Sequence, residues 1–378
     1  MIRTLTTRRP TTPPMGVDIG ATGVRAVQAT RAKGRWRVVA AARSGRAGPD
    51  GDAGAAPDGV DVHLARGLRQ GGFRKRDTAI ALSPPDVEFH SLELPDAVLG
   101  GDADRATQVV RWEIERLMTH AETHVETRYW RLPSGPGSGA NAIGVAADRG
   151  TVTRVTDACR AAGVSCRRVD TAATALTRLG ALLGAWGRDE VWGTLDLGAR
   201  QTRLMLCTDD VPVLVRVVGS GGQAWTKLLA DSLDVTPKTA ELQKREYGIT
   251  GTVRGARRDD RRDRPGPRET RHAAPSDALA SITYGVLRTE LHALAAEVKR
   301  SYEYVLSCYP RCHAADLILV GGGAGMRNLP EWLASAAGVC MRRASDYMRG
   351  GSCALEYPET AGAPLESMAV AVGLALGP

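Results

Sequence analysis

Two aspartates that are far apart in the chain lie in short sequence motifs with the same spacing, which we call the two phrases. The phrases are "VDIGATGVR" at residues 17–25 and "LDLGARQTR" at residues 195–203. In both, a glycine follows the aspartate by two positions and an arginine follows it by seven. Apolar residues alternate on either side, and glycine tolerates the positive φ of tight turns. Each phrase therefore predicts a strand, a turn and a second strand.

Such a hairpin suits phosphate chemistry. Backbone N–H groups at a turn form a concave anion site, and small residues let a phosphate approach closely. An aspartate just ahead of the turn holds Mg²⁺ through water, and the metal bridges phosphate oxygens. Two facing hairpins predict a nucleotide clamp, with Asp18 and Asp196 on opposite sides of the magnesium.

Two further segments have residue types that suit a nucleoside. The turn Gly321–Gly323 follows "LILV", and three glycines let a planar base lie on the backbone, although such turns also arise from close packing. "AELQK" places Glu241 and Lys244 three apart on one helical face, where they can hydrogen-bond ribose hydroxyls. The alternative for this pair is an ordinary surface ion pair.

Length and composition set the surrounding structure. A chain of 378 residues favours two domains, each with its own sheet. Hydrophobic residues make up 43% and charged residues 24%, as in soluble globular proteins, and no apolar run reaches the ~20 residues of a membrane span. The seven cysteines lack Cys-x-x-Cys spacing, which favours reduced thiols in a cytosol, and "CYPRCH" lacks partners for a metal site. We therefore expect a cytoplasmic protein.

The net charge is +8, and much of the positive charge lies in a basic run at residues 254–272. Acids alternate with arginines there, prolines interrupt any helix, and no aromatics are present to stack on bases. This pattern predicts a disordered, solvated loop and disfavours nucleic-acid binding. Contact with an anionic membrane surface stays open as an alternative.

The order of the parts resembles the actin-like ATPase superfamily and, within it, the type IV pilus assembly PilM family, with the division protein FtsA as a cousin. The segments that carry the resemblance are "GVDIGATGVRAVQ", "LELPDA" before "RWEIERLM", "AADRGTVTRVTDACRAAGVSCRRVD" and "GSGGQAWTKLLADSLDVTPKTAELQKREYG". It implies an α/β actin-like (duplicated ribonuclease-H-like) fold with two domains around a nucleotide cleft. The implied parts are a tail at 1–14, a first domain at 15–190 with an inserted subdomain at about 78–169, a second domain at 191–350 with a disordered insertion at 254–275, and a segment at 351–378 that returns to the first domain.

The resemblance also implies roles for individual residues. Phosphate and Mg²⁺ would be held by the two hairpins, the cleft would be lined by the glycines after the second hairpin, and ribose and adenosine would be met by the residues discussed above. In chain order, these residues are Asp18, Gly20, Ala21, Thr22, Gly23, Asp196, Gly198, Ala199, Arg200, Thr202, Gly221, Gly222, Glu241, Lys244, Gly321, Gly322 and Gly323.

Catalysis is a separate question. Asp170, in "VDTAATAL", falls where related ATPases position the attacking water, although the same setting suits a helix cap. Arg200 and Gln201 stand where the family usually has small residues, and Gly23 replaces a hydroxyl residue. Arg200 would either strengthen ATP binding or fill the pocket. We expect ATP binding with weak or absent hydrolysis.

By the resemblance, the chain is expected to be a PilM-like, ATP- and Mg²⁺-binding scaffold at the inner membrane. Its partner would be the N-terminal cytoplasmic peptide of a PilN-like membrane protein, held beside the inserted subdomain, with other pilus platform proteins and a homo-oligomeric ring as further partners. The alternatives are an FtsA-like division or type II secretion scaffold and a small-molecule kinase of the same fold.

Overall fold

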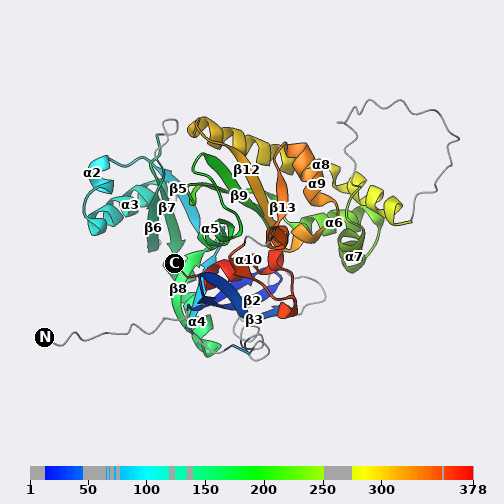
Figure 1. Ribbon diagram of the computed structural model, residues 1–378, viewed down its shortest axis with the longest axis horizontal. Coiled ribbons are helices and arrows are strands. Elements are labelled where there is room, and N and C mark those ends of the chain that lie inside the picture. The colour runs from blue at the N-terminus through cyan, green and yellow to red at the C-terminus, as the bar shows by residue number, and fades with distance from the viewer. Residues whose placement is uncertain are drawn as a thin grey trace.

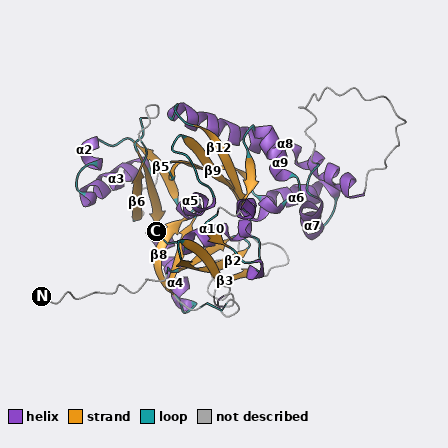
Figure 2. Ribbon diagram, viewed as in Figure 1, coloured by secondary structure: helices purple, strands orange, loops and turns teal. Residues whose placement is uncertain are grey.

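The computed structural model describes residues 13–45, 65, 68, 72–73, 77–118, 124–133, 139–250, 275–350 and 353–377. In this part of the chain, two large sheets lie side by side with helices packed around them (Figures 1 and 2). Nearly all of the predicted tail at 1–14 and of the predicted basic insertion lies outside the described residues.

The first sheet has six strands in the order β14-β3-β2-β1-β4-β8. Strands β1, β2 and β3 form an antiparallel meander. Strand β4 pairs with β1 in parallel, β8 pairs with β4 in parallel, and β14 pairs with β3 in parallel. Helices α4 (Arg149–Ala161) and α5 (Ala172–Leu183) flank β8 in the chain. The strands are β1 (Met15–Gly20), β2 (Gly23–Ala32), β3 (Arg35–Gly45), β4 (Asp77–Leu82), β8 (Ser165–Thr171) and β14 (Leu355–Glu356).

The second sheet repeats this topology in the order β11-β10-β9-β12-β13. Again an antiparallel meander comes first, and two parallel strands join its first member. The two aspartate phrases thus occupy equivalent places, at the β1–β2 and β9–β10 turns. The strands are β9 (Glu190–Leu197), β10 (Gln201–Thr208), β11 (Val211–Ser220), β12 (His313–Val320) and β13 (Met341–Arg343).

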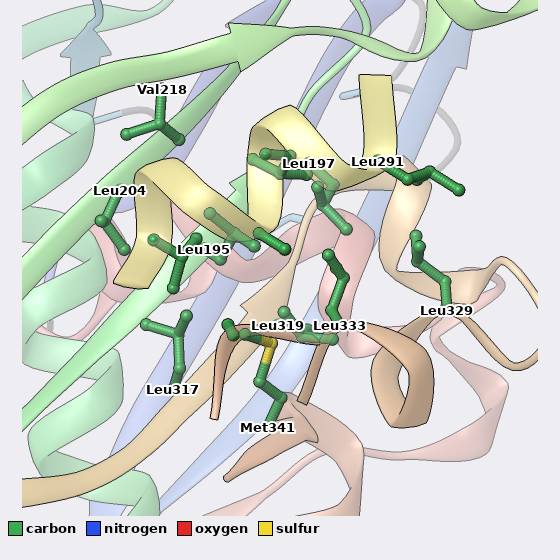
Figure 3. Close-up of a cluster of buried hydrophobic side chains, with 14 of the residues drawn as sticks. Leu195, Leu197, Leu204, Val218, Leu291, Leu317, Leu319, Leu329, Leu333 and Met341 are labelled. Carbon is green, nitrogen blue, oxygen red and sulfur yellow. The ribbon is translucent and has the colours of Figure 1, made fainter. Parts of the chain in front are cut away.

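A leucine-rich core joins the second sheet to its helices. Alternate residues of β9, β10 and β12 are fully buried and face α8 and α9, as Figure 3 shows for Leu195, Leu204 and Leu319. Helix α8 has 34 residues and packs along this core. The helices are α6 (Gly222–Leu233), α7 (Pro237–Tyr247), α8 (Pro275–Cys308) and α9 (Leu329–Ala337), with short 3₁₀ turns at η2 (Gly322–Gly325), η3 (Ala344–Gly350) and η4 (Glu359–Ala361).

A separate three-stranded sheet, in the order β5-β7-β6, lies within the predicted inserted subdomain. The strands β4 and β8, at the two ends of that range, pair instead in the six-stranded sheet. The small sheet reaches the second half of the molecule through Trp130, whose indole N–H donates to the carbonyl of Pro212 at 2.8 Å. Its elements are β5 (Glu88–Leu92), α2 (Asp96–Leu99), α3 (Ala103–Leu117), β6 (Val125–Arg131) and β7 (Ala142–Asp148).

The C-terminal helix α10 (Leu365–Ala375) packs against β1, β2 and β4 of the first sheet. Glycines make this approach possible. A Cβ at Gly16 of β1 would lie 2.0 Å from the carbonyl oxygen of Ala371, and one at Gly373 would lie 1.9 Å from that of Ala175. The helix is buried almost all round, which explains why its sequence is apolar on every face.

Candidate nucleotide site

The first hairpin brings Asp18 and Arg25 directly opposite each other on β1 and β2. Their side chains form an ion pair of 3.1 Å, and Arg25 also donates to Thr22 Oγ1 at 3.2 Å. The guanidinium lies over the turn, because a Cβ at Gly20 would be 2.6 Å from Nη1 of Arg25. Gly23 adopts a φ of 147° beside the carbonyl oxygen of Ser44, and Ala21 and Thr22 form the turn itself. The predicted phosphate turn therefore has a guanidinium group over it, and Asp18 neutralises that group.

The second hairpin repeats the arrangement. Asp196 and Arg203 lie opposite each other on β9 and β10 and form an ion pair through Oδ2. Asp196 is buried, and Arg203 is a quarter exposed. The turn at Gly198, Ala199 and Arg200 closes through the N–H of Gly198 and the carbonyl of Gln201.

The two ion pairs act on each other electrostatically. Burial raises the pKa of the Asp18 carboxyl, Arg25 and Arg203 lower it, and the Asp196 carboxylate raises it further. Two residues of the second hairpin therefore lie within electrostatic range of the first. The two hairpins therefore lie near each other, and their predicted role as a nucleotide clamp stays a prediction.

The start of α6 is built onto the second turn. The N–H groups of Gly221, Gly222 and Gln223 donate to the carbonyls of Arg200, Gly198 and Ala199. Thr202, predicted to lie at the phosphates, is fully buried and its hydroxyl donates to the carbonyl of Ser220 at 2.7 Å. The turn, the strand β10 and the helix α6 thus form one rigid unit. The phosphate roles predicted for these residues stay predictions.

The half-buried Glu241 and the buried Lys244 of α7 form an ion pair that contacts the start of α6, and we call this pair the bracket. The Lys244 ammonium lies 2.5 Å from Glu241 Oε2, 2.7 Å from the carbonyl oxygen of Gly222 and 2.6 Å from Thr226 Oγ1. Burial lowers the pKa of Lys244 although Glu241 opposes this. For Glu241, burial raises the pKa, but Lys244 and the hydrogen bonds outweigh it and hold the pKa below its ordinary value. The pair is more than a surface contact, and its predicted ribose role remains a prediction.

The glycine turn after β12 contains two kinds of position. Gly321 has a φ of 84°, and a Cβ there would lie 2.4 Å from Asp196 Oδ1, so this glycine is required for packing. A Cβ at Gly323 would meet Cβ of Leu197 at 2.9 Å. At Gly322 a Cβ would meet nothing within 4 Å. Of the three predicted glycines, only Gly322 thus faces open space, which a surface for a nucleoside requires.

Asp170 lies at the end of β8 in a dense polar cluster. Its carboxylate contacts Arg178 at 2.6 Å and Arg168 at 3.4 Å, and both arginines also donate to carbonyls near the end of α10. The N-cap of α5 is Thr171, the next residue, whose N–H is bonded to Asp170. The carboxylate is therefore already engaged by strong donors, and its role in positioning water stays a prediction.

The carboxylates fit the predicted water-mediated contact with Mg²⁺. Each arginine donates to Oδ2 of the aspartate opposite it. Within the described residues, Oδ1 of neither Asp18 nor Asp196 accepts a hydrogen bond. Direct coordination fits less well, because no group of three or more His, Cys, Asp or Glu side chains in the described ranges is arranged to hold a metal. Any metal here would rely on water and phosphate oxygens for most of its ligands.

Sequence reasoning noted the two arginines as part of the phrase but gave them no role. The signal was present, because a spacing of seven across a hairpin turn places the aspartate and the arginine opposite each other. The spacing alone does not indicate whether the aspartate pairs with the arginine or binds a metal.

The comparisons with known proteins identify the family and the fold. The profile of the family described as "Type IV pilus assembly protein PilM" matches residues 16–253, well over half of the chain. The chain belongs to the PilM family. A search among curated proteins finds no match.

Solved structures support the same fold for this PilM-family chain. The structure described as "PilM-PilN type IV pilus biogenesis complex" is 24% identical, with a TM-score of 0.73, covering 97% of this chain and 98% of that one. The ethanolamine utilization protein EutJ from Carboxydothermus hydrogenoformans is 15% identical, with a TM-score of 0.51 and coverages of 98% and 91%. MreB5 of Spiroplasma citri bound to ADP is 12% identical, with a TM-score of 0.51 and coverages of 97% and 96%. The predicted actin-like fold is confirmed.

The family match favours pilus assembly over the division, secretion and kinase alternatives. Among the described helices, none combines the length and apolar character needed to cross a bilayer.

Proposed function

We propose that this PilM-family chain binds ATP with Mg²⁺ between its two hairpins and serves as a scaffold for type IV pilus assembly. Asp18 and Asp196 hold the metal through water, and Arg25 and Arg203 lie over the turns that receive the phosphates. The chain binds the N-terminal cytoplasmic segment of a PilN-like membrane protein and is held at the inner membrane by that partner. Turnover is slow or absent, and other platform proteins and a ring of copies complete the assembly.

The observation that carries the nucleotide site is the pair of equivalent Asp-Arg hairpins facing each other. Four charges balance within the site, so a triphosphate would find guanidinium groups in place without an unpaired carboxylate repelling it. The neighbour MreB5 was solved with ADP, which supports a nucleotide as the ligand class. The neighbour that contains PilN supports the partner.

The polar cluster around Asp170 supports a binding role more than a hydrolytic one. A general base needs a carboxylate that is free to accept a proton from water. Here two guanidinium groups contact that carboxylate. ATP would then act as a ligand that holds the two halves of the molecule in one arrangement.

Calorimetric titration with Mg·ATP tests the site. We expect saturable binding by the wild type and its loss in Asp196→Ala, with Asp157→Ala, a change on the exposed face of α4, as the control. Equal binding by all three proteins would refute the clamp.

A fluorescent peptide with the N-terminal cytoplasmic sequence of a PilN-like single-span membrane protein tests the scaffold role. A scrambled peptide of the same composition is its control. Equal affinity for both peptides would refute the partner.

A further inference from the structure

Two cysteines of the first half of the molecule lie side by side beneath the sheet edge. Cys159 is in the last turn of α4 and is fully buried, whereas Cys166 is the second residue of β8 and is partly exposed. Cys166 packs against the buried apolar cluster that contains Cys159, and each thiol shifts the pKa of the other through a hydrogen bond. Thr78 of β4 contacts both residues, because its hydroxyl lies 3.9 Å from Cys159 Sγ and its backbone pairs with Cys166.

The chain reversal between the two cysteines fixes this contact. Gly163 adopts a φ of 75°, its N–H donates to the carbonyl of Arg160, and the N–H of Val164 donates to that of Cys159 at 3.0 Å. This is a helix C-terminal motif in which the glycine supplies the left-handed conformation. These backbone hydrogen bonds fix the path of the chain between the two cysteines.

We propose that Cys166 and Cys159 form a redox-sensitive modification site that closes to a disulfide when the protein meets hydrogen peroxide. The Cys166 thiolate attacks one peroxide oxygen, the O–O bond breaks and hydroxide leaves, so that sulfur is oxidised to the sulfenic acid. The Cys159 thiol then loses its proton and its sulfur attacks Cys166 Sγ. The S–O bond breaks, hydroxide leaves, and the protons taken up give two waters in total.

The surroundings assign different tasks to the two sulfurs. The hydrogen bond from Cys159 lowers the pKa of Cys166 to about 7, so that much of it is thiolate at neutral pH. The hydrogen bond to Cys166, together with burial, raises the pKa of Cys159. A partly exposed thiol of low pKa beside a second cysteine is the arrangement of a redox sensor.

The charged groups beside the pair are already neutralised. Asp77 of β4 pairs with Arg167 of β8 at 3.1 Å, and Asp157 pairs with Arg160 on α4 at 2.5 Å. The polar groups that act on Cys166 are therefore Cys159, Thr78 and the carbonyl of Arg168, to which its thiol donates at 3.6 Å.

Cys340 provides a sharp internal control. It is the exposed cysteine among the seven, yet burial of its sulfur and a hydrogen bond to Asp316 raise its pKa. If exposure governed reactivity, Cys340 would react first. If the Cys159–Cys166 contact governs it, Cys166 reacts first.

The test uses the full chain treated with a small excess of peroxide, then alkylated with iodoacetamide and mapped by peptide mass spectrometry. We expect a peptide pair linked through Cys159 and Cys166, with alkylated Cys340. Cys159→Ala should instead accumulate a sulfenic acid at Cys166 that dimedone traps, and Cys340→Ser should form the disulfide as the wild type does.

A pH series of alkylation without peroxide keeps the proposal testable even if Cys159→Ala does not fold. The alkylation rate of Cys166 should reach half its maximum near pH 7. Faster modification of Cys340, or recovery of both Cys159 and Cys166 in alkylated form after peroxide, would overturn the proposal.

Discussion

Asp196 and Arg203 lie directly opposite each other on the β9–β10 hairpin and form an ion pair. Asp18 and Arg25 form the equivalent pair on β1 and β2. Each aspartate is therefore tied to the strand that follows its own turn. The geometry of each hairpin is therefore fixed locally, within its own pair of strands.

The Asp196–Arg203 pair should stabilise the fold measurably. A charge-assisted contact of a buried carboxylate contributes more than a surface pair, because removal of one partner leaves the other without compensation. From a double-mutant cycle of Asp196→Ala and Arg203→Ala in urea unfolding, we expect a coupling of about 1–3 kcal/mol. The exposed pair Asp157–Arg160 serves as the reference, at about 0–1 kcal/mol. Equal couplings for the two pairs would contradict this prediction.

Gly322→Ala should separate nucleotide binding from folding. The new methyl group meets no protein atom within 4 Å, so the free energy of unfolding should change by no more than about 1 kcal/mol. If the adenosine lies on this turn, the methyl group obstructs it, and we expect ATP affinity to fall about tenfold, or about 1.4 kcal/mol.

Gly325→Ala is the matched control, because its Cβ also meets nothing within 4 Å in the same 3₁₀ turn. Calorimetric titration of the two variants checks the prediction. Equal ATP affinity for Gly322→Ala and the wild type would place the adenosine elsewhere.

The bracket of Glu241 and Lys244 should make stability depend on pH in the acid range. The pKa of Glu241 is lower in the folded protein than its ordinary value of 4.5. The unfolded chain therefore binds this proton more readily. The contribution of the bracket is fully present above pH 4.5 and is lost as the pH falls through the lower folded pKa.

This effect is measured by thermal melting between about pH 3 and pH 6, a range that spans the titration of carboxyl groups. Glu241→Gln should show a shallower loss of melting temperature on acidification than the wild type. Glu246→Gln, a change at an exposed residue of the same helix, should follow the wild-type curve. Parallel curves for all three proteins would mean that Glu241 contributes nothing to acid sensitivity.

Asp170→Asn should destabilise the protein. The substitution removes the charge that Arg168 and Arg178 share where β8 meets α10, and we expect a loss of about 1–3 kcal/mol in urea unfolding. Asp157→Asn should change stability by no more than about 0.5 kcal/mol. An unchanged stability of Asp170→Asn, together with lost phosphate release from ATP, would instead support the role in positioning water.

Local patterns were sufficient to predict much of the fold. The alternating apolar residues around Asp18 and Asp196 predicted both hairpins, and the structure places them at equivalent points of two similar sheets. These features depend on residues close in sequence, so periodicity and turn chemistry determine them.

The fate of each polar group was decided by the tertiary structure. Lys244 is held by a carbonyl and a hydroxyl of α6, and Asp170 by Arg168 and Arg178 of neighbouring elements. Cys159 and Cys166 meet because a glycine turn returns the chain to Thr78. The sequence by itself determined which residue types lie near the cleft. Which partner each one contacts depends on distances across elements that only packing fixes, because ion pairs and hydrogen bonds act over a few ångströms.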